Sequence, residues 1–183
     1  MNTDIQNLIG ETTVYDKKQI LEAKRPKSWL KSVSAFANGE GGTLIFGISD
    51  DDHIVGLADA KGDAERISEE IKSKLDPVPT VNLELKDADG KTLLLLYVYP
   101  GQETPYYYIG DKQRIAFVRI GNESVTADRT QLKALVLKGY GRTYDSLPSN
   151  YRFEDMAFSK LRSVHYKRLQ RSFEDSEFTS WGI

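Results

Sequence analysis

The chain has 183 residues, 25 of them Lys or Arg and 27 Asp or Glu, and its formal net charge of −2 argues against a protein that coats nucleic acid through overall positive charge. It contains no cysteine and 2 histidines, which excludes disulfides, thiolate catalysis and cysteine-based zinc sites and argues against a histidine-rich metal site. The most apolar run, Leu93 to Val98, is too short to span a bilayer, so we expect a cytoplasmic protein with no membrane association.

The first predicted elements are a short strand over residues 19–24 and an amphipathic helix that begins near Pro26. The helix is indicated by apolar residues at helical spacing, namely Trp29, Val33, Phe36 and Ala37. Asn38 and Gly39 are expected to end it, with the Asn38 amide in a capping role.

A glycine turn and a buried strand follow this helix. Gly41 and Gly42 allow backbone conformations that are closed to other residues, and Thr43 to Ile48 has the continuous apolar character of a buried strand. The acidic run Asp50, Asp51 and Asp52 then forms the next turn.

A second helix and a hairpin are expected in the middle of the sequence. The apolar stripe of the helix is Ala64, Ile67, Ile71 and Leu75, and Asp76-Pro77 ends it. Residues 80–86 alternate, which predicts an inward set of Val81, Leu83 and Leu85 and an outward set of Asn82, Glu84 and Lys86. Asp89-Gly90 then turns the backbone into a strand over residues 91–99.

The last predicted elements are a strand over residues 115–120 and a helix that begins near Asp128 and stops at Gly139. A polar, turn-rich linker over residues 142–150 leads to a helical segment, 151–183, with Phe153, Ala157, Leu161 and Val164 on one face. We expect this segment to be the start of a region that continues in a longer protein. The pattern predicts an α+β fold, a mixed β-sheet with flanking helices, over residues 10–141.

Several of these segments together resemble the Schlafen-type Alba-like DNA-binding domain of bacterial regulators and Schlafen proteins. They are Glu22-Ala23-Lys24, Ser34 to Asp50, Ile54 to Leu57, Thr104 to Tyr107 and Phe117 to Asn122. The resemblance runs from about Gly10 to Gly141. It implies a domain of a transcriptional regulator that binds nucleic acid, DNA in the first instance, as a homodimer, and it implies that further domains of the same protein follow after this one.

The residues predicted to hold nucleic-acid phosphates are Lys24, Arg25, Lys27, Lys31 and Arg119. Most of them lie at and beside a helix start, where charge and backbone amides favour anions, although scattered lysines also form ordinary solvated surfaces. Arg114 and the three tyrosines from Tyr106 to Tyr108 could add guanidinium contacts and base stacking, or the tyrosines could simply pack.

The enzyme alternative is a divalent-metal-dependent ribonuclease of the Schlafen type. The resemblance places its catalytic and metal-binding carboxylates at Glu22 and Asp50, with Asp51 or Asp52 as alternates, and its metal would be Mg²⁺ or Mn²⁺. Lys17 stands where such enzymes have a further glutamate, and Asp16 would point to the opposite face of a strand. We therefore expect no catalytic cofactor.

The glycine-rich run does not predict an ATP site. Its glycines follow a helix and enter a strand, whereas a phosphate loop precedes a helix whose N-terminus faces the anion. Asn38, Gly39, Gly41 and Gly42 are therefore interpreted as a structural turn. A third functional class stays open, a regulatory protein-interaction module that uses the acidic second helix, which carries Glu65, Glu69 and Glu70.

Overall fold

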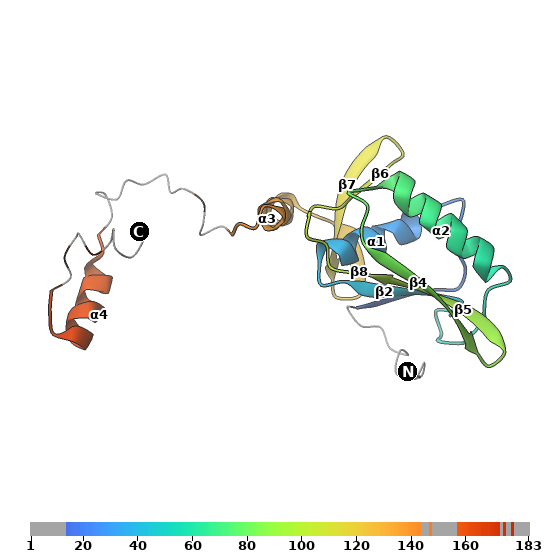
Figure 1. The fold of residues 1–183 in the computed structure, drawn as a ribbon, viewed down its shortest axis with the longest axis horizontal. Helices are drawn as coiled ribbons and strands as arrows, with labels where there is room; N and C mark the ends of the chain where they lie inside the picture. Colours follow the sequence, from blue (N-terminus) through green and yellow to red (C-terminus); the bar gives the residue numbers. More distant parts are fainter. Residues whose placement is uncertain (1–13, 144–146, 148–156, 173, 175–176, 178–183) are drawn as a thin grey trace. The chain divides into compact units, whose positions relative to one another are not determined.

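The computed structural model describes residues 14–143, 147, 157–172, 174 and 177. The chain divides into two compact units, one up to residue 146 and one from residue 147 (Figure 1). The second unit contains helix α4 (Ser159–Leu169) and the first contains every other element given below. Phe153 lies outside the described residues. The domain bounds 10–141, 142–150 and 151–183 stay a prediction.

Two four-stranded sheets form the first unit. The first sheet is mixed, because its edge strand runs parallel to the next strand and the other pairs are antiparallel; its order is β1 (Tyr15–Lys18), β2 (Gly42–Phe46), β5 (Lys91–Val98), β4 (Val81–Ala88). The second is antiparallel, in the order β3 (Leu75–Asp76), β6 (Tyr107–Gly110), β7 (Gln113–Ile120), β8 (Glu123–Thr126). The predicted α+β class with a mixed sheet is confirmed.

Three helices belong to this unit: α1 (Lys27–Asn38), α2 (Ala60–Lys74) and α3 (Arg129–Gly139). They match the predicted helices closely, because each carries its own local signals. The exception is Leu75, predicted in the second helix, which begins strand β3 instead. Asp59 caps α2 by accepting a hydrogen bond from the Gly62 amide, and Asp128 opens α3 with a capping box. Among the described residues, no helix combines the length and the apolar character needed to cross a membrane.

Helix α1 is the centre of the core, because it contacts strands of both sheets. Trp29, Leu30, Val33 and Phe36 are at most 1% exposed, and Trp29 meets Phe46 of β2 edge to face, with ring centroids 6.1 Å apart. Full burial of a large apolar side chain contributes about 1.5–3 kcal/mol, so these four residues are a main source of stability. A helix packed between two sheets must also bury its polar side chains.

Those polar side chains bind the second sheet directly. The Asn38 amide nitrogen donates to the carbonyls of Tyr106 (3.0 Å) and Phe117 (2.9 Å), and its amide oxygen accepts from the Tyr106 N–H (2.7 Å). Ser34 Oγ donates to the Tyr106 carbonyl (2.7 Å) and accepts from the Phe117 N–H (3.2 Å). We call Asn38 and Ser34 the polar clamp. The predicted capping role of Asn38 is wrong, because its amide is fully used in these contacts.

The predicted glycine turn is present after α1. The Gly39 N–H bonds to the Ala35 carbonyl (3.0 Å) and ends the helix, and Gly41 has a φ of +84°. At Gly42 a Cβ would lie 2.4 Å from Phe36 Cδ1. Gly41 is therefore required by the turn and Gly42 by the close approach of β2 to the helix.

The strand predicted over residues 19–24 is wrong, since the strand that leads to α1 is β1, which ends at Lys18. Residues 22–25 turn instead, with the Arg25 N–H bonded to the Glu22 carbonyl (3.0 Å). The sequence of β1 has no apolar alternation that would reveal it. Parallel pairing with β2 defines this strand, and the backbone must turn before it can enter a helix that crosses back.

The β4–β5 hairpin is confirmed, with one difference in its side-chain pattern. Asp89 and Gly90 both have positive φ (54° and 71°), as a two-residue hairpin turn requires. Val81 and Leu83 are partly buried against the core, but Leu85, predicted to point inward, is 42% exposed. The β4 strand therefore extends beyond the core that covers its first half.

We expect Asn38→Ala to lower the free energy of unfolding by about 3 kcal/mol or more. The substitution leaves the Phe117 carbonyl and the Tyr106 N–H without a partner, at about 1–3 kcal/mol for each unsatisfied group, while the Tyr106 carbonyl keeps its bond from Ser34 Oγ. Urea unfolding followed by circular dichroism measures the change, with Asn82→Ala on the exposed face of β4 as the matched control. A loss below about 1 kcal/mol would contradict a structural role for the clamp.

Candidate nucleic-acid interface

The turn that follows β1 delivers a group of cations to the start of α1. Lys24, Arg25, Lys27 and Lys31 line one open hollow of about 520 Å³, together with Pro26, Ser28 and Asp111. We call these four cations the basic cluster. The structure thus brings together four of the five residues that the sequence predicts to bind phosphate.

The electrostatics of this helix start favour an anion. The cap residue of α1, Pro26, makes no side-chain hydrogen bond to the first turn, and that turn contains no acidic residue. The N-terminal end of a helix carries partial positive charge, so cations placed there are destabilising unless an anion joins them. With four cations against the carboxylates of Glu22 and Asp111, the hollow keeps an excess of positive charge.

The four cations differ in how far they are already engaged. Lys27 donates to Gln113 Oε1 (2.7 Å) and its ammonium lies 5.6 Å from the centre of the Tyr108 ring. Within the described part of the protein, Lys24 and Lys31 make no hydrogen bond or ion pair through their ammonium groups. Lys24 and Arg25 are exposed, whereas Lys27 and Lys31 are half-buried. Part of the cluster is thus anchored and part is available to a ligand.

Glu22 serves this cluster as a counter-ion. Its carboxylate forms an ion pair and hydrogen bond with Arg25. The pKa of Glu22 is lowered, mainly by the nearby Ser28 hydroxyl and further by the charge of Arg25. The Ser28 hydroxyl makes no hydrogen bond of standard geometry with any described residue. Glu22 is therefore ionised and directed at the basic cluster.

Asp50 lines a hollow of its own, separate from that of the basic cluster. It is exposed, and it shares this smaller hollow with Tyr15, Asp16, Lys17, Lys18 and Asn122. Glu22 and Asp50, the predicted catalytic and metal-binding pair, do not line the same hollow, although Lys18 lines the Asp50 hollow and its charge also acts on Glu22. Nor do the described residues contain any group of three or more acidic or histidine side chains that could hold a metal ion.

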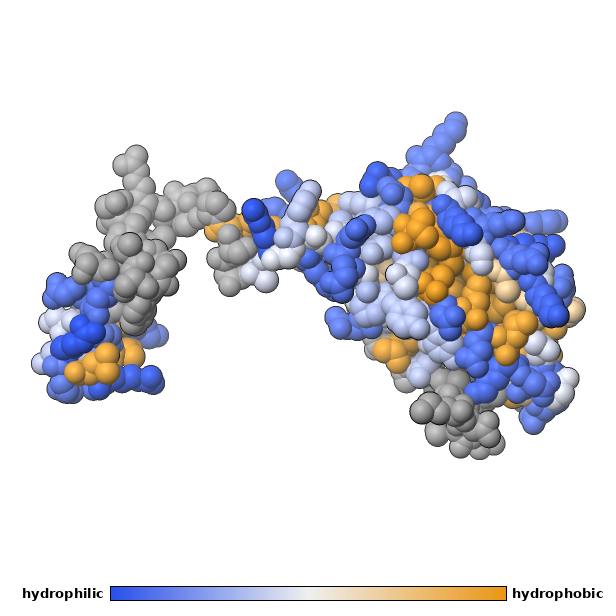
Figure 2. All heavy atoms as spheres, in the orientation of Figure 1, coloured by the Kyte–Doolittle hydropathy of each residue, from blue (hydrophilic) through white to orange (hydrophobic). Residues whose placement is uncertain are grey.

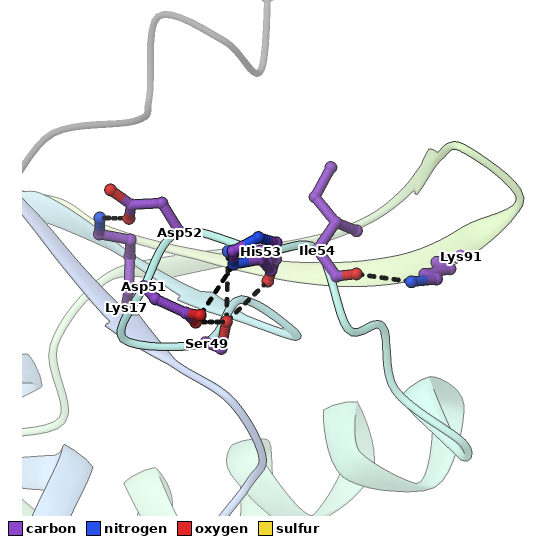
Figure 3. Close-up of polar contacts among 7 residues, drawn as sticks. All are labelled: Lys17, Ser49, Asp51, Asp52, His53, Ile54 and Lys91. Carbon is purple, nitrogen blue, oxygen red and sulfur yellow. Dashed lines mark hydrogen bonds and ion pairs between the residues drawn. The ribbon is translucent and has the colours of Figure 1, made fainter.

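Two of the three carboxylates in the acidic turn are bound within the fold (Figure 3). Asp52 forms an ion pair with Lys17, whose side chain is only 10% exposed. Asp51 accepts a hydrogen bond from Ser49, and this bond is the main cause of the lowered pKa of Asp51. The Asp51 carboxylate also lies 2.9 Å from the His53 ring nitrogen Nδ1. Lys17, which replaces a glutamate of the nuclease pattern, thus brings positive charge to this turn.

Arg119 is bound within the fold by hydrogen bonds to other segments of the first unit. Its guanidinium donates to Ser124 Oγ (3.1 Å) and to the Tyr15 carbonyl (3.1 Å), and lies 4.9 Å from the centre of the Phe36 ring. Burial lowers the pKa of Arg119. It lines a separate hollow beside Asn38 and Gly39, so the structure does not place it with the basic cluster.

Sequence reasoning left the tyrosines open between stacking and packing. Tyr106 and Tyr108 are buried, at 6% and 1% exposure, and so pack in the core. Tyr107 is half-buried and carries the Arg114 guanidinium 4.3 Å above its ring, and Arg114 also pairs with Asp76 (3.1 Å). Tyr106 leads into strand β6, and Tyr107 and Tyr108 begin it, so the tyrosines do not form a loop. The preference of aromatic residues for strands could have indicated this.

A second polar network was not foreseen from the sequence. Asp16 accepts from Ser32 of α1 and pairs with Lys18 (2.8 Å), and Ser32 in turn accepts from Ser124 Oγ (3.1 Å). It joins β1 and β8 to the buried helix. No local signal could have found it, because its members come from three distant segments.

Comparison with known proteins agrees with the fold. Residues 11–128 match the family described as Schlafen, AlbA_2. The DIP2311 protein of Corynebacterium diphtheriae has a crystal structure that is 18% identical, with a TM-score of 0.51, over 85% of this chain and 33% of that protein. The sequence therefore spans about a third of the length of that protein.

A second solved structure is the N-terminal domain of a putative ATP-dependent DNA helicase RecG-related protein from Nitrosomonas europaea, determined by NMR. It is 23% identical with a TM-score of 0.49, over 69% of this chain and 88% of that domain. Among curated proteins, none matches the sequence. At these identities the likeness to solved structures concerns the fold alone.

We expect Arg119→Ala to reduce stability and not merely binding. Loss of two charge-assisted hydrogen bonds to Tyr15 and Ser124 should lower the free energy of unfolding by about 1–3 kcal/mol, as measured by urea unfolding. Lys24→Ala is the control, with a change within about 0.5 kcal/mol because Lys24 is exposed. Equal stability of the two variants would rule out the structural assignment of Arg119.

Proposed function

The chain belongs to the Schlafen, AlbA_2 family, and from that premise we propose that it binds nucleic acid, DNA in the first instance, as part of a transcriptional regulator. The binding surface is the basic cluster at the start of α1. The ligand is the phosphate backbone.

The observation that carries this proposal is the position of the four cations. They converge on one hollow at a helix N-terminus whose first turn contains no acid and receives no capping hydrogen bond from the Pro26 side chain. A phosphate group placed there meets the positive end of the helix dipole as well as two or more charged side chains. Arginine can bind it through two parallel hydrogen bonds, and lysine as a point charge.

Such contacts position a duplex without reading its sequence, because phosphate is the same at every base pair. If all four cations neutralise phosphates, the logarithm of the binding constant falls with the logarithm of salt concentration with a slope of about −3.6, at about 0.9 per contact. Four phosphate contacts are few for tight binding. A homodimer that presents two such clusters doubles the footprint and the slope.

The surface extends toward the second sheet. Lys27 bonds to Gln113 at the start of β7, and the next residue, Arg114, is stacked on Tyr107. A guanidinium on a partly exposed aromatic ring is an arrangement that also contacts bases and backbone in single strands. Arg114 is therefore the residue that we propose to continue the path of the nucleic acid from α1.

The nuclease alternative has weaker support. Glu22 is held by Arg25, and the position of the further carboxylate is Lys17, which forms an ion pair with Asp52. Asp50 lines a hollow that does not include Glu22. A metal-dependent nuclease needs carboxylates that converge on a cation. We therefore propose that binding needs no metal cofactor.

We expect Lys24→Ala combined with Arg25→Ala to weaken binding of labelled duplex DNA and to lower the salt slope by about 2, since each lost phosphate contact removes about 1. Fluorescence anisotropy at several salt concentrations measures both. The matched control is Lys61→Ala with Lys72→Ala, which removes the same charge from exposed positions of α2.

Two results would contradict this surface. One is an unchanged affinity in the Lys24, Arg25 variant. The other is an equal loss in the control, which would point to net charge alone. If the wild-type protein retains neither duplex DNA, single-stranded DNA nor structured RNA, a protein-interaction role takes precedence.

The nuclease alternative is tested with divalent metal. We expect retention of nucleic acid to be the same with Mn²⁺ and with chelator, and we expect no cleavage. Glu22→Gln should bind at least as well as wild type, because it removes a negative charge that competes for Arg25. Cleavage that requires Mn²⁺ and disappears in Glu22→Gln would establish the enzyme instead, with gel electrophoresis of labelled RNA as the measurement.

A further inference from the structure

The outer strand of the first sheet, β4, has a free edge among the described residues. It is eight residues long and its only neighbour in that sheet order is β5. The register with β5 is continuous from Val81 to Ala88, so no bulge interrupts it, and the strand contains no proline. Proteins usually protect an edge with a bulge, a proline or a very short strand. Charged side chains are a further protection, and β4 carries Glu84, Lys86 and Asp87, so its edge is open in backbone geometry but bears charges.

Two hydrogen bonds fix which residues of β4 face that edge. The Tyr99 N–H bonds to the Thr80 carbonyl (3.0 Å), whereas the Thr92 carbonyl, opposite Asp87, bonds to Leu57 (2.8 Å) and so points away from β4. In an antiparallel pair, residues alternate between those that bond to the neighbour and those that point outward. The N–H and C=O groups of Leu83, Leu85 and Asp87 therefore point to the free edge.

The side chains along this edge have a symmetric pattern. Leu85 is 42% exposed and lies between Glu84 and Lys86, which share the other face of the strand. Glu84 is exposed and accepts a hydrogen bond from Tyr97 (3.0 Å), and Lys86 is half-buried. Figure 2 places apolar surface in the region where α2 and β4 run. An opposite charge on either side of one apolar residue is complementary to itself after a twofold rotation.

We propose that β4 pairs antiparallel with β4 of a second copy of this protein, about a twofold axis at Leu85. In this register Leu85 lies opposite the partner's Leu85, and Glu84 opposite the partner's Lys86. This register fits an antiparallel ladder in its backbone, because the N–H and C=O of Leu85 point outward and can bond to those of the partner's Leu85. It also fits in its side chains, because the opposite charges meet at the closely spaced positions between hydrogen bonds.

Neighbouring registers are less favourable. An axis at Glu84 or Lys86 places like charges directly opposite each other, and at that position the backbone groups already bond to β5. The pairing joins the first sheet of one copy to the first sheet of the other in one continuous sheet. It therefore removes the free edge of β4 from both copies. This interface does not depend on nucleic-acid binding.

The first test is Leu85→Pro in the 183-residue protein. Proline removes an N–H that points away from β5, so the hairpin within one copy is retained, but the hydrogen bond at the centre of the interface cannot form. Analytical ultracentrifugation over a concentration series should give a wild-type monomer–dimer equilibrium, and a dimer dissociation constant at least tenfold higher for the variant. Circular dichroism should be unchanged.

The second test is a charge exchange, which keeps strand propensity and fold. Glu84→Lys alone and Lys86→Glu alone should each raise the dimer dissociation constant by about tenfold, because symmetry repeats each repulsion twice. The double variant with both substitutions should return it to within about threefold of wild type.

The inference is overturned by a wild-type protein that is monomeric at every concentration, by a dimer that Leu85→Pro leaves intact, or by a double exchange no better than the single ones. A Leu85→Pro variant that unfolds would leave the charge exchange to decide. Loss of dimer together with intact binding at the basic cluster would separate this interface from the proposed function.

Discussion

The first unit depends on a helix that is buried between two sheets and held by its own polar side chains. Apolar packing of α1 brings the sheets together, but it does not fix how they are aligned. The polar clamp does, because Asn38 and Ser34 satisfy backbone groups of Tyr106 and Phe117 that would otherwise be buried without partners. With the C-terminal end of α1 fixed, the other end of this 12-residue helix lies about 18 Å away, at about 1.5 Å per residue. That end carries the basic cluster.

The distribution of charge explains how a protein of near-neutral net charge can present the basic cluster that we propose to bind phosphate. Positive groups that are paired inside the fold, such as Lys17 with Asp52 and Arg119 in its partly buried setting, do not contribute to that cluster. Lys24 and Lys31 have no comparable partner among the described residues. The net charge of −2 therefore says little about the potential at the start of α1, which is set by nearby groups.

One copy of this cluster offers few phosphate contacts, and the open edge of β4 offers a way to repeat it. Pairing through an edge strand uses backbone hydrogen-bonding groups that the sheet already presents, so it needs little apolar area to begin. The two features lie on different elements, α1 and β4, and each can be altered without the other. The proposed binding of nucleic acid and the proposed pairing of two copies can therefore be tested separately.

The sequence by itself determined the features that arise from local preference, whereas the tertiary structure alone decided whatever depends on a distant partner. Pro26 and the apolar spacing predicted α1, Asp89-Gly90 predicted the hairpin, and the run from Lys24 to Lys31 predicted a shared basic surface, because residues close in sequence at one helix start remain close in space. By contrast, Asn38 became a clamp through residues 68 and 79 positions away, and β1 became a strand through β2. Local sequence carries no record of such partners, so the pattern could pair Glu22 and Asp50 although Glu22 is bound by Arg25 and does not line the Asp50 hollow.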